Sequence, residues 1–241
     1  MVNPSFKAFG SKAILIEWPP QISETILLDI LLFKQKIESR FKGFYDLTTA
    51  YNSLTIFLQN PITDFDKQVA ILKNIYQTPI RLSNLDHYVW QIPVCYDLEF
   101  GLDLEFYLKS KNLSLDQLID LHTKPLYTIH FLGFLPGFPY LGGLPETLNI
   151  PRKFNPSLNV PKGSVGIGGK QTGVYTMESP GGWYVIGKTP IPFFDVNLKD
   201  PCFLKAGDKI KFFEISKDDF YKISNEIEKQ NYLVKMELYH A

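Results

Sequence analysis

The residues best suited to binding chemistry lie on segments rich in glycine and proline in the second half of the chain. Three segments stand out: FLGFLPGFPYLGG at 131–143, GSVGIGGKQTG at 163–173 and ESPGGWYVIGKTP at 178–190. Glycine lets a ligand approach the backbone closely, and a cation beside it can hold a carboxylate or a phosphate. The sequence therefore predicts that binding surfaces lie on turns and loops of this half.

The segment 163–173 matches a phosphate-binding loop only in part. A Walker P-loop has a glycine, four residues and then Gly-Lys-Ser/Thr. Gly169 and Lys170 fit this pattern, but Ser164 takes the place of the first glycine and Gln171 that of the hydroxyl residue. A standard P-loop is therefore excluded. Two interpretations stay open, a glycine-lined surface for a ligand and glycines that serve the corners of a barrel.

No spacing of a nucleophile and a base is visible. Ser164 lies in KGSVG, which is not the GxSxG of a nucleophile elbow, and Ser179 precedes a Pro-Gly-Gly turn. None of the four histidines has a carboxylate or cysteine at the spacing of a metal site, so no metal is predicted. We interpret His130 as a core or surface residue. His122 is kept as a candidate because it lies on a short helix before the aromatic segment and can reach that segment.

Hydrophobic periodicity predicts the elements of the first ninety residues. Strands are expected at 12–18, 44–50, 54–58 and 87–93, and helices at 22–41 and 64–77. The resulting order, β-α-β-β-α-β, is that of a ferredoxin-like domain. We therefore expect residues 1–90 to form such a domain and to act as a scaffold or docking domain.

The remaining residues, 91–241, are expected to form a second domain of a different kind. Two short helices form an insert near 100–123, and the second of them opens with a capping box of Ser114 and Gln117. Further on, short strand patterns alternate with Gly/Pro turns, which favours a β-barrel or a sandwich. The strands are expected at 127–134, 164–168, 174–177, 183–186 and 209–215, and a last helix at 217–229. The predicted fold class is α+β.

Composition excludes several classes of partner. Lys plus Arg equals Asp plus Glu, 25 against 25, so charge predicts neither nucleic acid nor an anionic membrane as the main partner. No apolar run approaches the ~18 residues needed to span a bilayer, and the amino terminus lacks the pattern of a secretory signal. Cys95 and Cys202 have no CxxC spacing. We therefore expect reduced thiols and a cytoplasmic location.

Several long motifs in fixed order resemble the allophanate hydrolase subunit 1 family, which corresponds to carboxyltransferase subdomains C and D. The motifs are FLGFLPGFPYLGGLP at 131–145, NVPKGSVGIGGKQTGVY at 159–175 and SPGGWYVIGKTP at 179–190, with further similarity at 92–105 and 118–134. The resemblance is dense from 91 to about 215 and weaker before. It implies that the carboxy-terminal domain is a cyclophilin-like β-barrel.

Members of this family include 5-oxoprolinase subunits, the sporulation kinase inhibitor KipI and the carboxyltransferase part of urea carboxylase. The resemblance implies first a B subunit, inactive alone, of an ATP-dependent enzyme that opens 5-oxo-L-proline to L-glutamate. The implied cofactor of the complex is ATP. The implied partners are a homologue of the enzyme's C subunit, which has a related fold, and a third, lactam-utilisation subunit. The alternatives are an inhibitor of a sensor histidine kinase and the carboxyltransferase half of a urea carboxylase or allophanate-type enzyme.

The motifs and the local chemistry together identify candidate residues for binding a ligand or a partner, but no catalytic residue. The candidates are His122, Phe134, Pro136, Gly137, Phe138, Tyr140, Lys162, Gly168, Lys170, Gln171, Gly181, Gly182, Trp183 and Lys188. Family members usually carry an arginine before VPxGS, where this chain has Asn-Pro-Ser-Leu at 155–158. An anion contact there requires Arg152 or Lys153 as a substitute.

The segment 131–143 is expected to follow an irregular path at the end of a strand, because its prolines and glycines disfavour a helix interior or a central strand. Two interpretations of its aromatic side chains stay open. They are core residues covered by 118–122, or they form the rim of a groove that meets a ligand or a partner.

Overall fold

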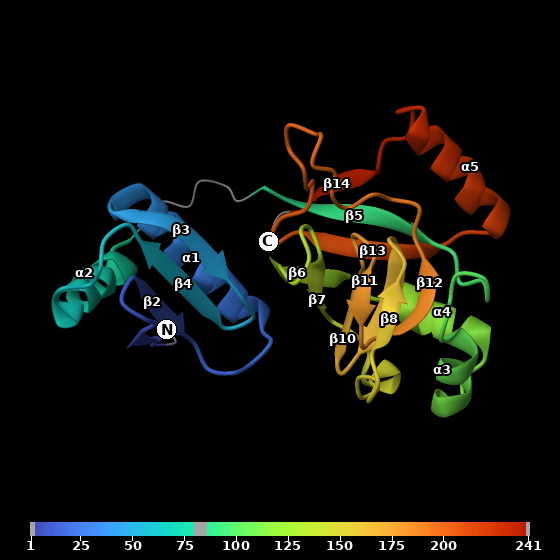
Figure 1. Cartoon of the computed structure of the whole chain (residues 1–241), viewed down its shortest axis with the longest axis horizontal. Coiled ribbons are helices and arrows are strands. Elements are labelled where there is room, and N and C mark those ends of the chain that lie inside the picture. Colours follow the sequence, from blue (N-terminus) through green and yellow to red (C-terminus); the bar gives the residue numbers. More distant parts are fainter. Residues whose placement is uncertain (1–2, 80–85, 240–241) are drawn as a thin grey trace. The chain divides into compact units, whose positions relative to one another are not determined.

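The computed structural model describes residues 3–79 and 86–239, and the chain divides into two compact units, Met1–Leu85 and Asp86–Ala241 (Figure 1). Each unit has a hydrophobic core of its own. Both contain helices and sheet, so the fold is of the mixed α+β class that the sequence predicts. Among the described residues, no helix is long and apolar enough to cross a bilayer.

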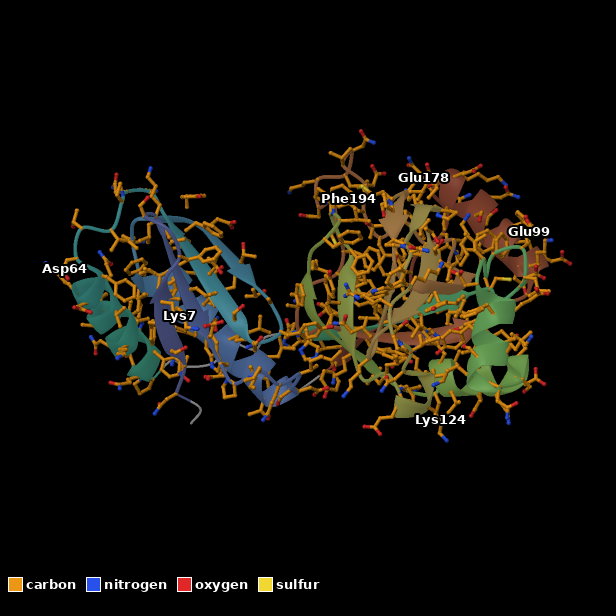
Figure 2. The ribbon with its side chains drawn as sticks, turned by 60° about the horizontal axis from the view of Figure 1, so that its bottom comes forward. Lys7, Asp64, Glu99, Lys124, Glu178 and Phe194 are labelled. Atoms are coloured by element: carbon orange, nitrogen blue, oxygen red, sulfur yellow. The ribbon has the colours of Figure 1, made fainter. Side chains whose placement is uncertain are left out.

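The first unit is an antiparallel sheet of four strands in the order β1-β2-β4-β3, accompanied by two helices (Figure 1). The elements are β1 (Ser5–Ala8), β2 (Ala13–Glu17), α1 (Glu24–Arg40), β3 (Phe44–Thr49), β4 (Ser53–Leu58) and α2 (Phe65–Gln77). At one edge of the sheet, Lys7 of β1 forms an ion pair with Glu17 of β2 (Figure 2).

Periodic apolar positions explain how this unit folds. The buried side chains of Ile30, Phe33 and Ile37 recur every three or four residues, so they share one face of α1. Alternate residues of β2 and β4 are buried and complete the same core. Asp64 begins α2 because its side chain accepts a hydrogen bond from the backbone N–H of Lys67 at 3.0 Å (Figure 2).

The structure differs from the predicted β-α-β-β-α-β order. The strand expected at 87–93 exists as β5 (His87–Val94), but it pairs with β13 (Lys209–Glu214) and β14 (Met236–Tyr239) of the second unit. The additional strand β1 precedes β2, so the first unit has the order β-β-α-β-β-α. Alternating apolar residues identify a strand but not its partner, and the alternate residues of β5 are buried in the core of the second unit.

The second unit is built around a mixed sheet of eight strands in the order β12-β9-β10-β7-β6-β13-β5-β14. The strands not yet given are β6 (Tyr127–Leu132), β7 (Pro139–Gly142), β9 (Ser164–Gly168), β10 (Gln171–Val174) and β12 (Tyr184–Lys188). Neighbours are antiparallel except β5 and β13, which are parallel. Cys95 and Lys188 exchange backbone hydrogen bonds of 2.9 and 3.0 Å. These bonds join the end of β5 to β12, so the strands from β12 to β5 form a ring.

Helices and a small ribbon complete the described part of the second unit (Figure 1). They are α3 (Leu104–Lys111), α4 (Leu115–Thr123), the short 3-10 helix η1 (Glu146–Leu148), α5 (Lys217–Glu228) and the two-stranded ribbon of β8 (Ser157–Val160) and β11 (Ser179–Gly181). The capping box predicted for Ser114 and Gln117 is confirmed at the start of α4. On the surface, Glu99, labelled in Figure 2, accepts a hydrogen bond of 2.8 Å from the hydroxyl of Tyr221 of α5.

Candidate functional site

The aromatic segment 131–143 is a tight connection between β6 and β7. The backbone N–H of Gly133 donates a hydrogen bond to the carbonyl of Phe138 at 3.1 Å. Phe134 and Gly137 lie in the left-handed region, with φ of 65° and 75°. Pro139 is the first residue of β7, a position that a strand tolerates. The irregular path predicted for the whole segment is therefore limited to residues 133–138, between β6 and β7.

This turn sends its two central phenylalanines into different surroundings. Phe138 is only 2% exposed and packs in a small core cluster with Tyr175 and Trp183, whereas Phe134 is 61% exposed. The two rings meet edge to face with centroids 5.5 Å apart. Leu118 belongs to the larger core and not to this cluster, so the cover predicted from 118–122 is wrong. Phe138 is therefore a core residue, whereas Phe134 lies exposed at the edge of the cluster.

A pocket of about 350 Å³ opens beside this cluster, and we call it the aromatic pocket. It joins the aromatic segment to residues 152–156 and to the turn 180–183, which are distant in the sequence. The lining residues are Phe134, Phe138, Tyr140, Arg152, Lys153, Pro156, Tyr175, Pro180, Gly181, Gly182 and Trp183. The lining includes six of the candidates chosen from the sequence, namely Phe134, Phe138, Tyr140, Gly181, Gly182 and Trp183.

Glycines of the neighbouring strands form the surface on which the pocket aromatics lie. A Cβ atom on Gly168 would lie 2.6 Å from Cγ of Trp183, and one on Gly181 would lie 2.7 Å from Cζ of Tyr175. Such separations are shorter than van der Waals contact allows. The two rings therefore occupy the space that side chains would take at these positions. Gly168 thus acts on the pocket by supporting Trp183, although it does not line it.

Two cations line the pocket, and they differ in their partners. Lys153 is held by Asp103, with Nζ 2.6 Å from a carboxylate oxygen, and by Ser157 Oγ at 2.8 Å. Asp103 also accepts a hydrogen bond of 2.8 Å from the backbone N–H of Val185, which ties this pair to β12. The guanidinium of Arg152 lies 5.8 Å from the ring centroid of Trp183. Arg152 and Lys153, the two residues that could take the place of the family's arginine, thus both line the pocket.

The other candidates are not part of the lining of the aromatic pocket. Lys162 and Lys170 are exposed on turns before and after β9. The ammonium of Lys188 lies over the rings of Phe100 and Phe220, at 5.7 and 5.9 Å from their centroids. The remaining candidates outside the lining are His122, Pro136, Gly137, Gly168 and Gln171. The composition of a turn indicates which residues can bind a ligand, but not which way the turn faces.

His122 is a structural residue of the core. It is completely buried, and its Nδ1 lies 2.7 Å from the hydroxyl of Tyr96. Its Nε2 lies 3.0 Å from Oγ1 of Thr172, whose hydroxyl donates to the carbonyl of Gly166. Nε2 therefore carries the proton, and Nδ1 accepts from Tyr96. Burial lowers the pKa of His122 from its ordinary 6.5 to about 3, because the core disfavours the cation.

The segment 163–173 forms the hairpin of β9 and β10, joined at Gly169, where φ is 66°. This arrangement is a strand, a turn and a strand, so it lacks the helix that a P-loop places behind its glycines. Among the described residues, no three side chains of His, Cys, Asp or Glu gather in a metal-binding group.

Part of the lining of the aromatic pocket was not among the candidates from the sequence. Tyr175, Pro156 and Pro180 line it, and Asp103 positions its lysine from a segment some fifty positions earlier. Tyr175 lies in the strand expected at 174–177, and a strand pattern does not tell which face of the sheet its ring occupies. Only the three-dimensional pairing of β8 with β11 brings residues 153–156 to residues 180–183.

Comparison with known proteins decides the family. The family model of the carboxyltransferase domain, subdomain C and D, matches residues 4–204 of the chain. The chain belongs to this carboxyltransferase family. All lining residues of the aromatic pocket fall within the matched region.

Three proteins similar to this chain differ in length and in sequence identity to it. The B subunit of 5-oxoprolinase from Bacillus subtilis is 36% identical over 93% of this chain and 98% of that protein. The protein of the same name from Haemophilus influenzae is 38% identical over 84% and 94%. The crystal structure of the Kluyveromyces lactis urea amidolyase aligns with 99% of this chain and 16% of its own, with a TM-score of 0.81 at 16% identity. This last similarity shows a shared fold alone.

Proposed function

We propose that this chain is the B subunit of an ATP-dependent 5-oxoprolinase, which opens 5-oxo-L-proline to L-glutamate. The observation that carries the proposal is the 36–38% identity to two proteins of that name over nearly their whole length. Relatives of such identity and similar length commonly share an activity. The two partners would be a homologue of the C subunit, with a related fold, and a third, lactam-utilisation subunit.

The described side chains support a role as a non-autonomous subunit. The hydroxyl of Thr172 and the imidazole of His122 meet, but both are completely buried and reach no substrate. Opening an unactivated lactam adds water across its C–N bond, and this reaction needs an activated carbonyl and donors for the developing charge. We therefore place the catalytic groups in the assembled complex, with this chain contributing a binding surface.

The described residues do not offer ATP a P-loop. The glycines of 163–173 serve the hairpin of β9 and β10, and Lys170 is exposed at its turn. We therefore propose that the complex uses ATP and that the hairpin of β9 and β10 is not a P-loop for it. We further propose that the strand ring of the second unit is a cyclophilin-like barrel, a proposal supported by the Cys95–Lys188 bonds that close the ring.

Reconstitution tests the proposed function. The chain alone is expected to show no ATP hydrolysis in response to 5-oxo-L-proline, whereas the complex with both partner subunits is expected to release ADP and L-glutamate together. The measurement is ADP and glutamate formation with and without 5-oxo-L-proline. The matched control is the pair of partner subunits without this chain. Full activity of that pair would contradict the proposal.

A carboxyltransferase half is the second candidate function. It is favoured by the family model and by the fold shared with the urea amidolyase structure. The two candidates differ in chemistry, because a carboxyltransferase moves a carboxyl group from biotin to an acceptor and consumes no ATP in that step. A complex that transfers carboxyl from carboxybiotin and ignores 5-oxo-L-proline would favour this second candidate.

A further inference from the structure

We propose that the aromatic pocket binds a small ring that carries one carboxylate, and that Arg152 is its anion-binding residue. The choice of 5-oxo-L-proline as the natural ligand rests on the proposed function. The class of ligand, a cyclic monocarboxylate, rests on the charge and shape of the pocket.

The charge of the lining favours a single negative charge on the ligand. Arg152 and Lys153 are the charged side chains of the lining, and no carboxylate is part of it. Lys153 is already neutralised by Asp103 at 2.6 Å. In the described part of the chain, no acidic side chain forms an ion pair with Arg152, so one positive charge of the pocket is uncompensated.

The field of Arg152 reaches into the pocket. Burial raises the pKa of Tyr140, and the positive charge of Arg152 opposes this rise. The same holds for Tyr175 on the opposite segment. A carboxylate placed among these residues would feel the same attraction. A guanidinium suits this task because its planar fork matches the two oxygens of a carboxylate.

The walls favour a ring in the rest of the ligand. Trp183, Tyr140 and Phe134 present aromatic surface, and Pro156 and Pro180 present aliphatic surface. A compact ring buries its apolar faces against such walls without losing the rotational freedom of an open chain. The volume of about 350 Å³ lies at the small end of the range for small-molecule sites. A single small ring therefore suits the space better than a nucleotide with its phosphates.

The pocket is held in its open form by interactions independent of a ligand. Asp103 links Lys153 to the backbone of Val185, and the backbone N–H of Lys153 donates to the carbonyl of Gly182 at 2.8 Å. The rings of Tyr175 and Trp183 lie directly against the backbone of Gly181 and Gly168, with no space for a side chain between them. Binding therefore orders little besides the exposed side chains of Arg152 and Phe134, which lowers its entropic cost.

The test is binding of three probes to the purified chain by calorimetry. The probes are 5-oxo-L-proline, cyclopentanecarboxylate, which keeps the ring and the charge, and 2-pyrrolidinone, which keeps the lactam but has no carboxylate. We expect the two carboxylates to bind and 2-pyrrolidinone to bind at least about tenfold more weakly. Arg152→Gln should weaken both carboxylates by about tenfold or more, and Phe134→Ala by a few-fold.

Lys109→Gln is the matched control, because it removes an exposed cation of α3 outside the lining, and binding should stay unchanged. Arg152 and Phe134 are exposed, so both variants should fold, which circular dichroism verifies. Equal binding of 5-oxo-L-proline by Arg152→Gln and the wild-type chain would overturn the inference. So would absence of carboxylate binding, or 2-pyrrolidinone binding as tight as that of 5-oxo-L-proline.

Failure of this inference differs from failure of the proposed function. A reconstituted complex that hydrolyses ATP with 5-oxo-L-proline at an unchanged KM after Arg152→Gln would keep the function and overturn the pocket assignment. A complex without lactam-dependent ATP hydrolysis, whose chain still binds cyclopentanecarboxylate through Arg152, would overturn the function and keep the ligand class.

Discussion

Acidification from pH 6.5 to about pH 4 is expected to lower the free energy of unfolding of the second unit by about 3 kcal/mol through His122 alone. Its pKa is about 3 in the folded chain and 6.5 in an unfolded one. Between these values the unfolded chain binds one more proton than the folded chain. The contribution of His122 is therefore complete above pH 6.5 and is lost progressively as the pH falls toward 3.

The contacts of His122 explain why its cation is unfavourable. Nδ1 accepts the hydroxyl proton of Tyr96 at 2.7 Å, so a proton on Nδ1 would reverse this hydrogen bond and place a positive charge in the buried core. Replacement by glutamine removes the titration and weakens this network. We expect His122→Gln to cost about 2–4 kcal/mol at pH 7, and the difference from the wild-type chain to shrink as the pH falls.

Urea unfolding at pH 7, 5.5 and 4, followed by tryptophan fluorescence, measures this effect; Trp90 and Trp183 report on the second unit and Trp18 on the first. The control is His87→Gln. Burial also lowers the pKa of His87, which lies 3.7 Å from Asp208, but His87→Gln leaves His122 in place. Its stability should therefore still fall with pH in the His122 window. Parallel pH curves for the wild-type chain and His122→Gln would show that His122 is not the titrating group.

Gly168→Ala is expected to destabilise the second unit by about 3 kcal/mol and to displace Trp183. The new methyl group would lie 2.6 Å from Cγ and 2.7 Å from Nε1 of the indole. The indole cannot retreat freely, because it packs edge to face on Phe138 at 5.5 Å and near Tyr140 at 6.4 Å. Overpacking of a filled site commonly costs about 1–3 kcal/mol, and a rigid ring places this case at the upper end.

Gly182→Ala is the matched control for this prediction. The nearest atom to a methyl group at this position is 3.8 Å away, an ordinary contact. Its free energy of unfolding should change by less than about 0.5 kcal/mol. Urea unfolding and the near-ultraviolet circular dichroism of the tryptophans compare the two variants. Equal stability of Gly168→Ala and Gly182→Ala would refute the role assigned to the glycine surface.

The elements of the fold could be predicted where the local signal is strong. The helices α1, α2 and α4 follow from apolar periodicity, α4 also from its capping box, and the structure has them close to the predicted positions. The partner of β5 could not be predicted, because its strand pattern fits either sheet and its pairing residues lie beyond position 208. The strands β8 and β11 have four and three residues, too few for a periodic pattern.

The candidate site could be predicted where the residues of a recognisable motif themselves line the pocket. Phe134, Tyr140 and Trp183 are conspicuous as aromatics on turns, and the structure brings them together in one pocket. Lys188 has the same sequence features of a binding residue, but its ammonium lies over the rings of Phe100 and Phe220, outside the lining of the pocket. Whether a turn faces the pocket depends on strand pairing, which a single sequence does not encode locally.

The parallel pairing of β5 with β13 constrains the order of events during synthesis on the ribosome. The strands of the first unit are paired with one another, so this unit can fold as soon as it has left the exit tunnel. β5 emerges next, but its parallel partner follows only after residues 95–208 have been made. Throughout that interval, an apolar strand and its unpaired backbone are exposed. Nascent chains of this protein therefore have a long window in which a chaperone that shields β5 would prevent aggregation.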